Sequence, residues 1–315
     1  MPPSLNYDSP QALRAYLDQR GLGMRKHLGQ NFLINSEARR KLLDALAIAP
    51  GDRVWEVGPG LGAMTAGLLD RGAEVSAFEL DRGFIAALEE FFGGRRGFAL
   101  IPGDVLKTWP VAWAETGGAA FLLGNLPYNI AAALLADFIE KNCFFTRAVV
   151  TVQREVARRM GAKPGSADYS SFSVLCASAY VITPLMVLRG ASFYPAPKVD
   201  SQGVRLDLRS DIDPAGYPPG FKPLVRGLFS ARRKTILNNL QNYLNSRILI
   251  GGGGRELAMD MLEKTGIDPN ERAENLGLEE FSALAAALPP GCGPAGGPAG
   301  GDRPAAERMV SHGNC

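Results

Sequence analysis

Histidine and cysteine are scarce in this sequence. Of its 315 residues, two are histidine and four are cysteine, and no two cysteines form a CxxC pair. This excludes a disulfide framework and a cysteine-rich zinc site, and it favours a reducing compartment. With two histidines in the whole chain, we expect no metal site. The scattered cysteines are Cys143, Cys176, Cys292 and Cys315.

Long apolar runs are absent as well. No stretch approaches the roughly 20 consecutive apolar residues of a membrane-spanning helix. The N-terminus has no apolar signal-peptide core, and Asp8 and Asp18 argue against a transit peptide. The hydrophobic share of 46% and the charged share of 21% are those of an ordinary globular protein. We therefore expect a cytoplasmic protein that does not associate with membranes.

The net charge is low, at +2, but the basic residues are unevenly distributed. Residues 221–254 contain six basic side chains and no acidic one, and two further basic clusters lie elsewhere. One such cluster is usually only a solvated face. Three clusters in a nearly neutral chain indicate surfaces that bind a polyanion. The clusters are Lys222, Arg226, Arg232, Arg233, Lys234 and Arg247; Arg25, Lys26 and His27 with Arg39, Arg40 and Lys41; and Arg154, Arg158, Arg159 and Lys163.

Short apolar strands and helices alternate along the first two thirds of the chain. Alternation of this length predicts an α/β fold with a parallel sheet covered by helices on both faces. The predicted strands are 53–57, 74–79, 98–101, 119–124 and 148–152, followed by 181–188 and 203–208. The predicted helices are 11–20, 36–47, 62–71, 81–92, 131–141, 154–160 and 171–179.

A change in composition near residue 211 predicts a domain boundary. We expect domain one to span residues 1–210, with 1–20 as an extension, and a small all-helical domain to span 211–288. Its predicted helices are 221–230, 234–245, 255–264 and 279–288. Residues 289–315 are rich in glycine and proline, cannot bury a core, and are expected to form a disordered tail.

A glycine-rich turn, Glu56-Val57-Gly58-Pro59-Gly60-Leu61-Gly62, leaves the first strand and enters a helix. Glycines let the backbone approach a ligand, and the helix N-terminus offers free N–H groups. Glu79 ends the next strand, where a carboxylate can accept both ribose hydroxyls. A nicotinamide or flavin nucleotide fits this pattern, but the spacing is GxGxG and Glu56 would repel a pyrophosphate. S-adenosylmethionine, which carries an ammonium group, tolerates that carboxylate.

Two more polar groups follow later strands of the predicted sheet. Asp104 could accept a hydrogen bond from an adenine amine, or it could cap the next turn. Asn125-Leu126-Pro127-Tyr128 could be a stiff turn with an aromatic cap, or a pocket for a flat ring with an exocyclic amine. Gly58, Glu79, Asp104 and Asn125 all follow the carboxyl ends of strands, where open parallel sheets bind ligands. We therefore expect them to share one site.

Taken together, these motifs resemble the ribosomal RNA adenine dimethyltransferase family, and within it the small-subunit, kasugamycin-sensitivity branch. The resemblance covers about residues 20 to 288 and implies a Rossmann-like S-adenosylmethionine methyltransferase sheet. It is carried by Lys26-His27-Leu28-Gly29-Gln30-Asn31-Phe32-Leu33, the glycine-rich turn, Glu79-Leu80-Asp81, Gly103-Asp104, Asn125-Leu126-Pro127-Tyr128-Asn129-Ile130, Phe193-Tyr194-Pro195-Ala196-Pro197-Lys198-Val199-Asp200-Ser201 and Arg232-Arg233-Lys234-Thr235.

The resemblance also implies roles for individual residues. The cofactor would contact Asn31, Leu33, Gly58, Gly60, Glu79, Asp104 and Asn125, with Glu79 on the ribose and Asp104 on the adenine. The target adenine would meet Asn125, the Leu126 carbonyl, Tyr128 and Phe193. RNA phosphates would meet Arg232, Arg233, Lys234, Arg154 and Arg158, and His27 would have a surface or phosphate role. The sequence departs from the family after Ile130, where Ala131-Ala132-Ala133 replaces the usual Ser or Thr and proline.

The implied activity is dimethylation of two adjacent adenines in a 3′-terminal hairpin of 16S-type small-subunit RNA. The partner would be a pre-30S-type particle late in assembly, and the enzyme would be a monomer. One alternative is a macrolide-resistance-type 23S RNA methyltransferase, whose motif usually has isoleucine in place of Leu126. Another is an assembly factor that acts by binding alone. A nicotinamide oxidoreductase is a more distant alternative.

Overall fold

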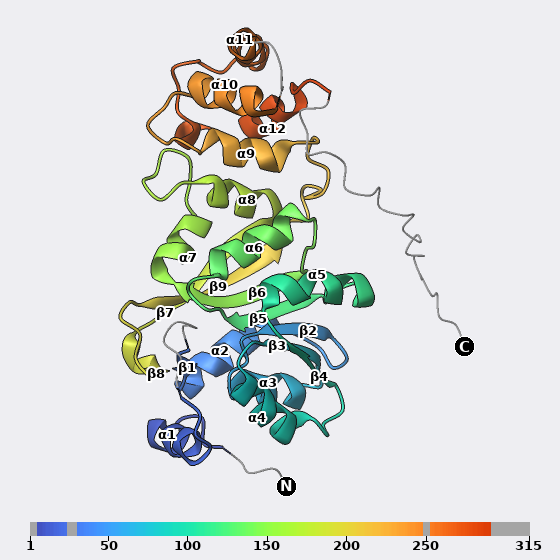
Figure 1. Cartoon of the computed structure of the whole chain (residues 1–315), viewed down its shortest axis with the longest axis vertical. Coiled ribbons are helices and arrows are strands. Elements are labelled where there is room, and N and C mark those ends of the chain that lie inside the picture. The colour runs from blue at the N-terminus through green and yellow to red at the C-terminus, as the bar shows by residue number, and fades with distance from the viewer. Residues whose placement is uncertain (1–4, 24–29, 248–252, 291–315) are drawn as a thin grey trace, which may run out of the picture.

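The computed structural model describes residues 5–23, 30–247 and 253–290. A β-sheet with flanking helices forms the middle of the molecule, α1 packs at one end, and a group of helices forms the other end (Figure 1). Among the described residues no helix is long and apolar enough to cross a membrane. The strands are β1 (Phe32–Leu33), β2 (Arg53–Val57), β3 (Glu74–Glu79), β4 (Phe98–Pro102), β5 (Phe121–Asn125), β6 (Arg147–Gln153), β7 (Tyr180–Leu188), β8 (Phe193–Tyr194) and β9 (Ser201–Leu208).

Most helices match the predicted ranges to within a few residues. The helices of the first part are α1 (Pro10–Gln19), α2 (Ser36–Leu46), α3 (Ala63–Asp70), α4 (Arg82–Phe92), α5 (Val105–Thr116), α6 (Ala131–Glu140), α7 (Arg154–Met160) and α8 (Ser171–Ala179). Those of the last part are α9 (Phe221–Leu228), α10 (Ile236–Arg247), α11 (Gly254–Thr265) and α12 (Leu278–Ala286). Two short 3₁₀ turns, Gly190–Ser192 and Ala273–Asn275, complete the described elements.

The main sheet has seven strands in the described part of the chain, in the order β4-β3-β2-β5-β6-β9-β7. The five strands from β2 to β6 are parallel, as the alternation predicted. The last two are not: β9 runs antiparallel to β6, and β7 runs antiparallel to β9. Because antiparallel neighbours need no helical crossover, the chain can return from β7 to β9 through residues 189–200 alone. The prediction of an α/β sheet with helices on both faces is confirmed, with a mixed edge.

Each face of the sheet has its own apolar core. One face packs against α5, α6 and α8 through residues such as Trp55, Leu122 and Phe138. The other face packs against α2, α3 and α4 through residues such as Val54 and Leu123. Adjacent residues of one strand, such as Val54 and Trp55, therefore enter opposite cores, as the two-residue period of a strand requires. This explains why these strands read as continuous apolar runs.

Helix α5 was not predicted from the sequence. Pro110 lies inside it and removes one backbone donor from the helix. Asp104 caps its first turn, Gly117 ends it in a left-handed conformation, and Trp109 is almost fully buried. Packing of the buried face therefore outweighs the cost of the internal proline.

The last four helices form a third core, which α8 shares. Leu224, Leu240 and Phe281 are fully buried there. Val174 of α8 belongs to this core, whereas its neighbour Leu175 belongs to the core beneath the sheet. Figure 1 shows α8 between α6 and α9. The helical end is therefore packed directly onto the sheet part through one common helix.

Candidate functional site

A cavity of about 230 Å³ opens where the parallel strands end. Its walls come from the turns after β2, β3, β4 and β5, from β1 and from the N-terminal segment. All seven residues that were predicted to contact a cofactor line it: Asn31, Leu33, Gly58, Gly60, Glu79, Asp104 and Asn125. The structure thus brings together groups that are up to 94 positions apart in the sequence, as expected for the carboxyl edge of an open sheet.

Glu79 is a buried carboxyl group held by backbone donors. Its Oε1 accepts hydrogen bonds from the amides of Leu80 and Asp81, both at 2.9 Å, and its Oε2 accepts one from Gly60 at 3.2 Å. Burial raises the pKa of Glu79 to about 7, although these three bonds act in the opposite direction. The carboxylate is thereby fixed at the end of β3, where it can accept hydrogen bonds from the hydroxyl groups of a ligand.

Glu56 is more deeply buried than Glu79 and is less well satisfied. Its Oε2 accepts a hydrogen bond from the Thr65 hydroxyl at 2.6 Å, but its Oε1 is buried without a partner among the described residues. Burial raises the pKa of Glu56 to about 7, and the nearby Glu79 raises it further while Thr65 lowers it. A buried carboxylate oxygen without a donor is costly. An ammonium group in the cavity would remove that cost, so Glu56 fits a ligand with an amino-acid end.

The glycine-rich turn follows β2 and forms the floor beside Glu56. Gly60 has a φ of 59°, and a Cβ atom there would lie 3.0 Å from the Phe32 ring. Both the left-handed backbone and the close ring therefore require glycine at this position. Phe32 also lines the cavity and packs against Phe84, with ring centroids 5.5 Å apart.

Asp104 fulfils one of the two functions that were considered for it, the capping of the next helix. Its Oδ1 accepts a hydrogen bond from the Leu106 amide at 3.0 Å and so caps α5. The residue also lines the cavity. Its Oδ2 has no hydrogen-bond partner in the described part of the chain and can therefore accept a hydrogen bond from a ligand amine.

Asn125 ends β5, and its amide has a fixed orientation. Its Nδ2 donates to the backbone carbonyl of Asn31 at 2.8 Å. Because a carbonyl can only accept, the amide nitrogen must face Asn31, and Oδ1 remains as the acceptor. Asn31 comes from the segment before β1, so the acceptor is oriented by a residue remote in the sequence.

The other residues predicted to bind the target base do not line this cavity. The Leu126 side chain is 1% exposed in the core, so only its backbone can face a ligand. Tyr128 is half-buried, and its hydroxyl lies 2.6 Å from Ser201 Oγ at the start of β9. Phe193 is buried beside β1, where it pairs with Leu33. Their contact with a base therefore stays a prediction.

Several lining residues were not expected from the sequence. Tyr7 and Leu13 belong to the N-terminal extension, and Arg39 was assigned only to a basic cluster. Ser201, which contacts Tyr128, was noted only as the last residue of a motif. No local sequence pattern identifies these residues, because their partners lie far away in the sequence.

His27 and the tail from residue 291 lie outside the described residues.

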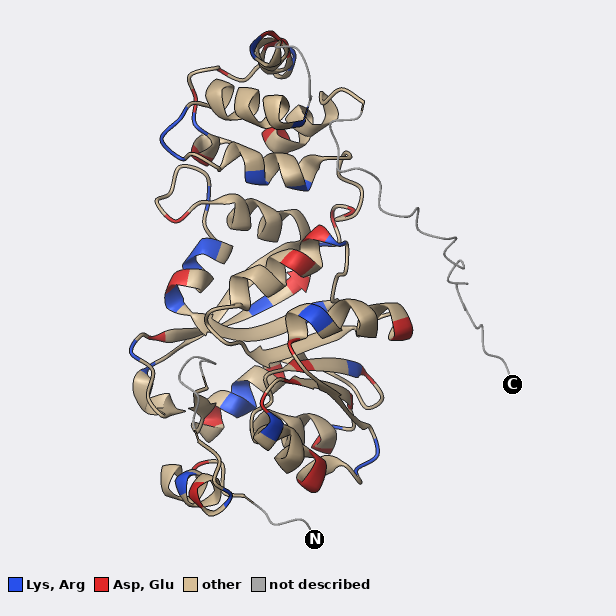
Figure 2. Cartoon of the chain, in the orientation of Figure 1, with Lys and Arg blue, Asp and Glu red and all other residues tan. Residues whose placement is uncertain are grey.

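Basic residues of α7 and of the loop between α9 and α10 lie on the same side of the molecule. Figure 2 shows α7 and the loop between α9 and α10 on this side, both with Lys and Arg. Arg154, Arg233 and Lys234 are exposed and have no ion-pair partner in the part of the chain that is described. Arg158 is exposed but pairs with Asp168 at 3.2 Å. Arg154 directly follows β6, the neighbour of β5, so the basic side begins at the edge that holds Asn125.

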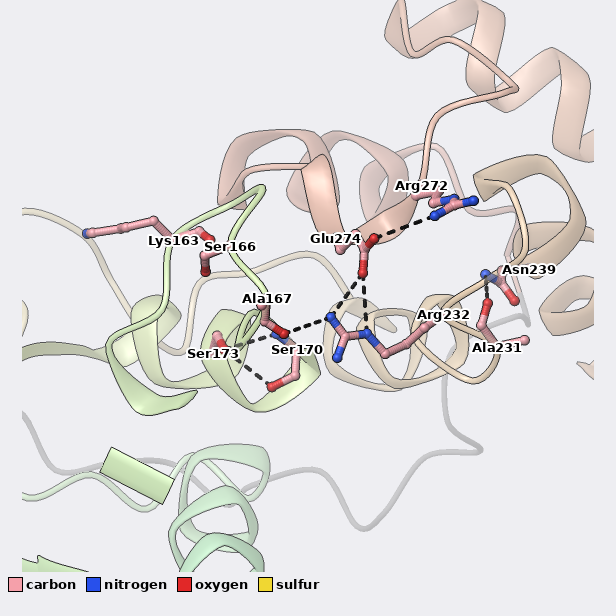
Figure 3. Close-up of polar contacts among 10 residues, drawn as sticks. All are labelled: Lys163, Ser166, Ala167, Ser170, Ser173, Ala231, Arg232, Asn239, Arg272 and Glu274. Atoms are coloured by element: carbon pink, nitrogen blue, oxygen red, sulfur yellow. Dashed lines mark hydrogen bonds and ion pairs between the residues drawn. The ribbon is translucent and has the colours of Figure 1, made fainter. Parts of the chain in front are cut away.

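Arg232 differs from its neighbours because its guanidinium already has protein partners. It donates to the Glu274 carboxylate at 3.0 Å and to the Ala167 carbonyl at 3.1 Å, as Figure 3 shows. It thereby connects the loop before α8 with the 3₁₀ turn before α12. Buried Asn239 donates to the Ala231 carbonyl at 3.1 Å and so holds the start of the same loop (Figure 3). The binding of RNA by Arg232 stays a prediction.

No cluster of His, Cys, Asp and Glu suited to a metal ion occurs among the described residues. The donors and acceptors in the cavity instead suit an organic ligand with a carboxylate, an ammonium group, hydroxyls and an amine. Gly60 and the α3 N-terminus provide room and free N–H groups. Glu56, Glu79 and Asp104 provide acceptors. S-adenosylmethionine carries all four kinds of group, and the residues present fit it.

Comparison with known proteins agrees with this geometry. The model of the family "Ribosomal RNA adenine dimethylase" matches residues 21–288. A Treponema denticola protein named ribosomal RNA small subunit methyltransferase A is 41% identical over 282 residues, or 89% of this chain and 94% of that protein. The crystal structure of a dimethyladenosine transferase from Plasmodium falciparum has a TM-score of 0.64 at 26% identity, over 79% of this chain and 94% of that one. The 23S rRNA methyltransferase ErmE, at 20% identity and a TM-score of 0.54 over 81% and 98% of the two chains, shares the fold.

Proposed function

The chain belongs to the ribosomal RNA adenine dimethylase family of S-adenosylmethionine-dependent enzymes, and we propose that it dimethylates two adjacent adenines of small-subunit ribosomal RNA. The observation that carries the proposal is the oriented amide of Asn125, which places an acceptor beside the cavity that holds Glu56, Glu79 and Asp104. An exocyclic adenine amine offers the N–H groups that such an acceptor needs.

The choice of the small subunit is supported by the relatives and by Leu126. The Treponema denticola protein that is named for the small subunit is 41% identical to this chain, whereas ErmE at 20% shares only the fold. Leu126 stands where the 23S enzymes usually have isoleucine. We further propose that the substrate is a 3′-terminal hairpin in a late pre-30S-type particle, that the enzyme acts as a monomer, and that it works in the cytoplasm, where such particles are assembled.

In the proposed reaction the protein mainly positions groups. S-adenosylmethionine supplies an activated sulfonium methyl group for an in-line displacement. Asn125 Oδ1 and the Leu126 carbonyl would accept hydrogen bonds from the adenine N6 amine and turn its lone pair out of the ring plane. Tyr128, held by Ser201, would stack on the flipped base, and Phe193 would form a second wall. The reaction then depends on orientation and not on a strong base.

The ligand-binding roles follow from the contacts at the cavity. Glu79 would accept hydrogen bonds from the ribose hydroxyls, and Asp104 Oδ2 would accept one from the adenine amine of the cofactor. Asn31, Leu33 and the glycine-rich turn would surround its methionine part. Glu56 would receive the ammonium group, because its Oε1 has no other partner among the described residues.

Binding of the RNA would depend mostly on phosphates. We assign residues 1–210 to the methyltransferase domain and 211–288 to a helical domain that helps to hold the RNA. Arg154, Arg233 and Lys234, exposed and unpaired in the described part, would contact phosphates directly. Arg158 and Arg232 would have to exchange their present carboxylate partners to do so.

The decisive experiment measures both the activity and its target. Small subunits that lack the modification are incubated with tritiated S-adenosylmethionine and the protein, and the labelled nucleotides are mapped. The expected result is two adjacent N6-dimethylated adenines near the 3′ end of the small-subunit RNA. Label on naked 23S RNA instead would assign the protein to the macrolide-resistance type. Tight binding to the particles without any label would leave an assembly factor that acts by binding alone.

A further inference from the structure

The N-terminal segment, defined as residues 5–20, precedes the part of the chain that matches the family model, which begins at residue 21. It is nevertheless firmly docked. Leu13 and Leu17 of α1 are 1% and 3% exposed and join the core of the sheet face beneath α2, α3 and α4. Beyond the helix, Arg20 donates to Glu90 of α4 at 2.8 Å. The segment is therefore fixed at two places, through the apolar face of α1 and through Arg20.

Tyr7 brings this segment into the cofactor cavity. Its side chain lines the cavity, and its hydroxyl donates to the Leu61 carbonyl at 2.9 Å, across 54 positions of sequence. Burial, with a smaller contribution from the Glu56 carboxyl, raises the pKa of Tyr7 above its ordinary value. The hydroxyl therefore stays protonated and can donate at any pH at which the protein works.

A second contact of the segment reaches another residue that lines the cavity. Asp8 forms an ion pair with Arg39, whose guanidinium also donates to the Leu33 carbonyl at 2.7 Å. The Arg39 side chain is 11% exposed and lines the cavity. Asp8 thus fixes the cation that supports Leu33, one of the residues assigned to the methionine part of the cofactor.

The turn that Tyr7 contacts needs such a restraint. Gly58, Gly60 and Gly62 all have positive φ, and glycine loses more conformational freedom than other residues when its backbone is fixed. Within the sheet part, the turn is held by backbone bonds and by the Gly60 amide on Glu79, a carboxylate that must also serve the ribose. The bond from Tyr7 to Leu61 holds the turn from outside the sheet without using a ligand-binding group.

From these contacts we propose that the N-terminal segment is a fixed wall at the methionine end of the cofactor cavity, and that Tyr7 is a positioning residue for the glycine-rich turn. The segment shapes the turn before the cofactor binds, so less ordering is needed on binding. This inference rests on the proposed assignment of the cavity to S-adenosylmethionine. It extends that assignment to residues for which the sequence motifs imply no role.

The test compares two conservative variants of the same segment. Tyr7→Phe removes the hydroxyl that reaches Leu61. Tyr16→Phe is the matched control, because the Tyr16 hydroxyl is buried without a partner among the described residues and its ring packs on Phe91, away from the cavity. Calorimetry on the full chain measures the affinity of each for S-adenosylmethionine and for 5′-methylthioadenosine, which lacks the amino-acid end. Thermal unfolding checks that each variant is folded.

The expected result is specific to one ligand, S-adenosylmethionine, and to the variants that remove a contact between the N-terminal segment and the cavity. Tyr7→Phe should weaken binding of S-adenosylmethionine about fivefold, as for the loss of one hydrogen bond, and leave binding of 5′-methylthioadenosine within about twofold. Asp8→Asn, which changes no cavity-lining atom, should act in the same direction, and Tyr16→Phe should change neither affinity.

Three results would overturn the inference: unchanged binding in Tyr7→Phe, an equal loss for both ligands, or the same loss in Tyr16→Phe. Failure of the unaltered protein to bind S-adenosylmethionine at all would instead refute the proposed function.

Discussion

At the scale of single residues, the two buried glutamates that line the cavity differ in how well their carboxyl groups are satisfied. Glu79 accepts three backbone hydrogen bonds, whereas Glu56 accepts one and keeps a buried oxygen without a partner among the described residues. A buried carboxyl oxygen that lacks a hydrogen-bond partner lowers the stability of the fold, and it is tolerated mainly where a ligand completes the site. Glu56 is thus expected to favour ligand binding at the expense of the stability of the cofactor-free protein.

Replacing Glu56 by glutamine tests this trade-off through pH. The folded-state pKa of Glu56, about 7, lies above its ordinary value of 4.5, so the folded protein binds the proton more tightly. This contribution to stability is fully present below about pH 4.5 and is lost as pH rises to about 7. Glu56→Gln should therefore raise the free energy of unfolding by about 1–2 kcal/mol at pH 8, after allowance for one unpaired amide.

The gain from Glu56→Gln should shrink steadily as the pH falls from 7 to 5, and the variant should bind S-adenosylmethionine less well. Urea unfolding of the cofactor-free protein at several pH values measures the first effect. Glu115→Gln, on an exposed part of α5, is the control and should show no such trend. A gain that does not depend on pH would contradict the assignment of the burial cost to the charged form.

Asn125 is the residue at which binding and chemistry should separate. Asn125→Ala removes the acceptor for the target amine but no group assigned to the ribose or adenine of the cofactor. Turnover should fall by more than about 100-fold, the effect of removing one polar group that acts in the transition state. The affinity for S-adenosylmethionine should change by less than about tenfold. Single-turnover methylation and calorimetry measure the two quantities.

Asn125→Asp distinguishes the orientation of the amide from its mere presence. A carboxylate would face the Asn31 carbonyl, and two acceptors would then meet at the present distance of 2.8 Å. The turnover of Asn125→Asp should therefore be no higher than that of Asn125→Ala. Near-normal turnover with Asp would contradict the role of Asn31 in orienting the side chain.

The residues that line the cavity after the strands were easier to predict than the residues that hold the site in place. Gly58, Glu79 and Asp104 follow strands with recognisable patterns, and their place at one sheet edge follows from the parallel arrangement. Tyr7 and Ser201 act through partners 54 and 73 positions away. No local pattern encodes such a pairing, so only the folded chain reveals it.

At the scale of elements, α6 connects the predicted target loop with the helical end. Its first residue follows Asn125-Leu126-Pro127-Tyr128 closely, and its last turn is capped by α9. Lys222 Nζ donates to the carbonyl of Ile139, to that of Glu140 at 3.3 Å and to Asn142 Oδ1 at 2.5 Å. Cations at a helix C-terminus satisfy the last carbonyls and interact favourably with the helix dipole.

Removing this cap should loosen α6 at its end remote from the cavity. Lys222→Met keeps an apolar stem but loses all three hydrogen bonds, and we expect a loss of about 1–2 kcal/mol in the free energy of unfolding. Lys264→Met, at an exposed position of α11, should cost less than about 0.5 kcal/mol. Urea unfolding measures both. Equal effects in the two variants would mean that the cap of α6 contributes nothing.

Predictions of elements failed where packing opposed a local signal. Pro110 reads as a helix breaker, yet α5 forms around it because Trp109 and Ala112 are buried. The antiparallel direction of β7 and β9 could not be predicted, because apolar pattern does not encode strand direction. The two-residue strands β1 and β8 form only because Phe32 meets Tyr194 and Leu33 meets Phe193.

At the scale of the whole molecule, the sheet and the helical end share a core through α8. Tyr169 and Val174 lie before residue 210, yet they pack into the core of the last four helices, and the Tyr169 hydroxyl donates to the Leu276 carbonyl at 2.9 Å. Composition predicts a domain boundary near residue 211 but could not reveal this shared packing. Positive side chains on α7 and on the α9–α10 loop are consequently held in one fixed relation, as the proposed binding to a rigid RNA surface requires.

The loop between α9 and α10 offers a test of that electrostatic role. Arg233 and Lys234 are exposed without ion-pair partners in the described part of the chain, whereas Arg232 is engaged by Glu274 and Ala167. Each phosphate contact that is lost should lower the slope of log affinity against log salt by about 0.7 to 0.9. The double variant Arg233→Ala, Lys234→Ala should therefore bind small subunits more weakly, with a slope reduced by about 1.5.

Arg232→Ala should behave differently, because it breaks a link between the loop before α8 and the turn before α12. We expect it to lower the free energy of unfolding by about 1 kcal/mol. The slope of log affinity against log salt should change by less than the amount expected for the loss of one phosphate contact. Filter binding at several salt concentrations, with urea unfolding alongside, measures both quantities. A full-contact change of slope in Arg232→Ala without loss of stability would mean that its guanidinium leaves Glu274 and binds a phosphate.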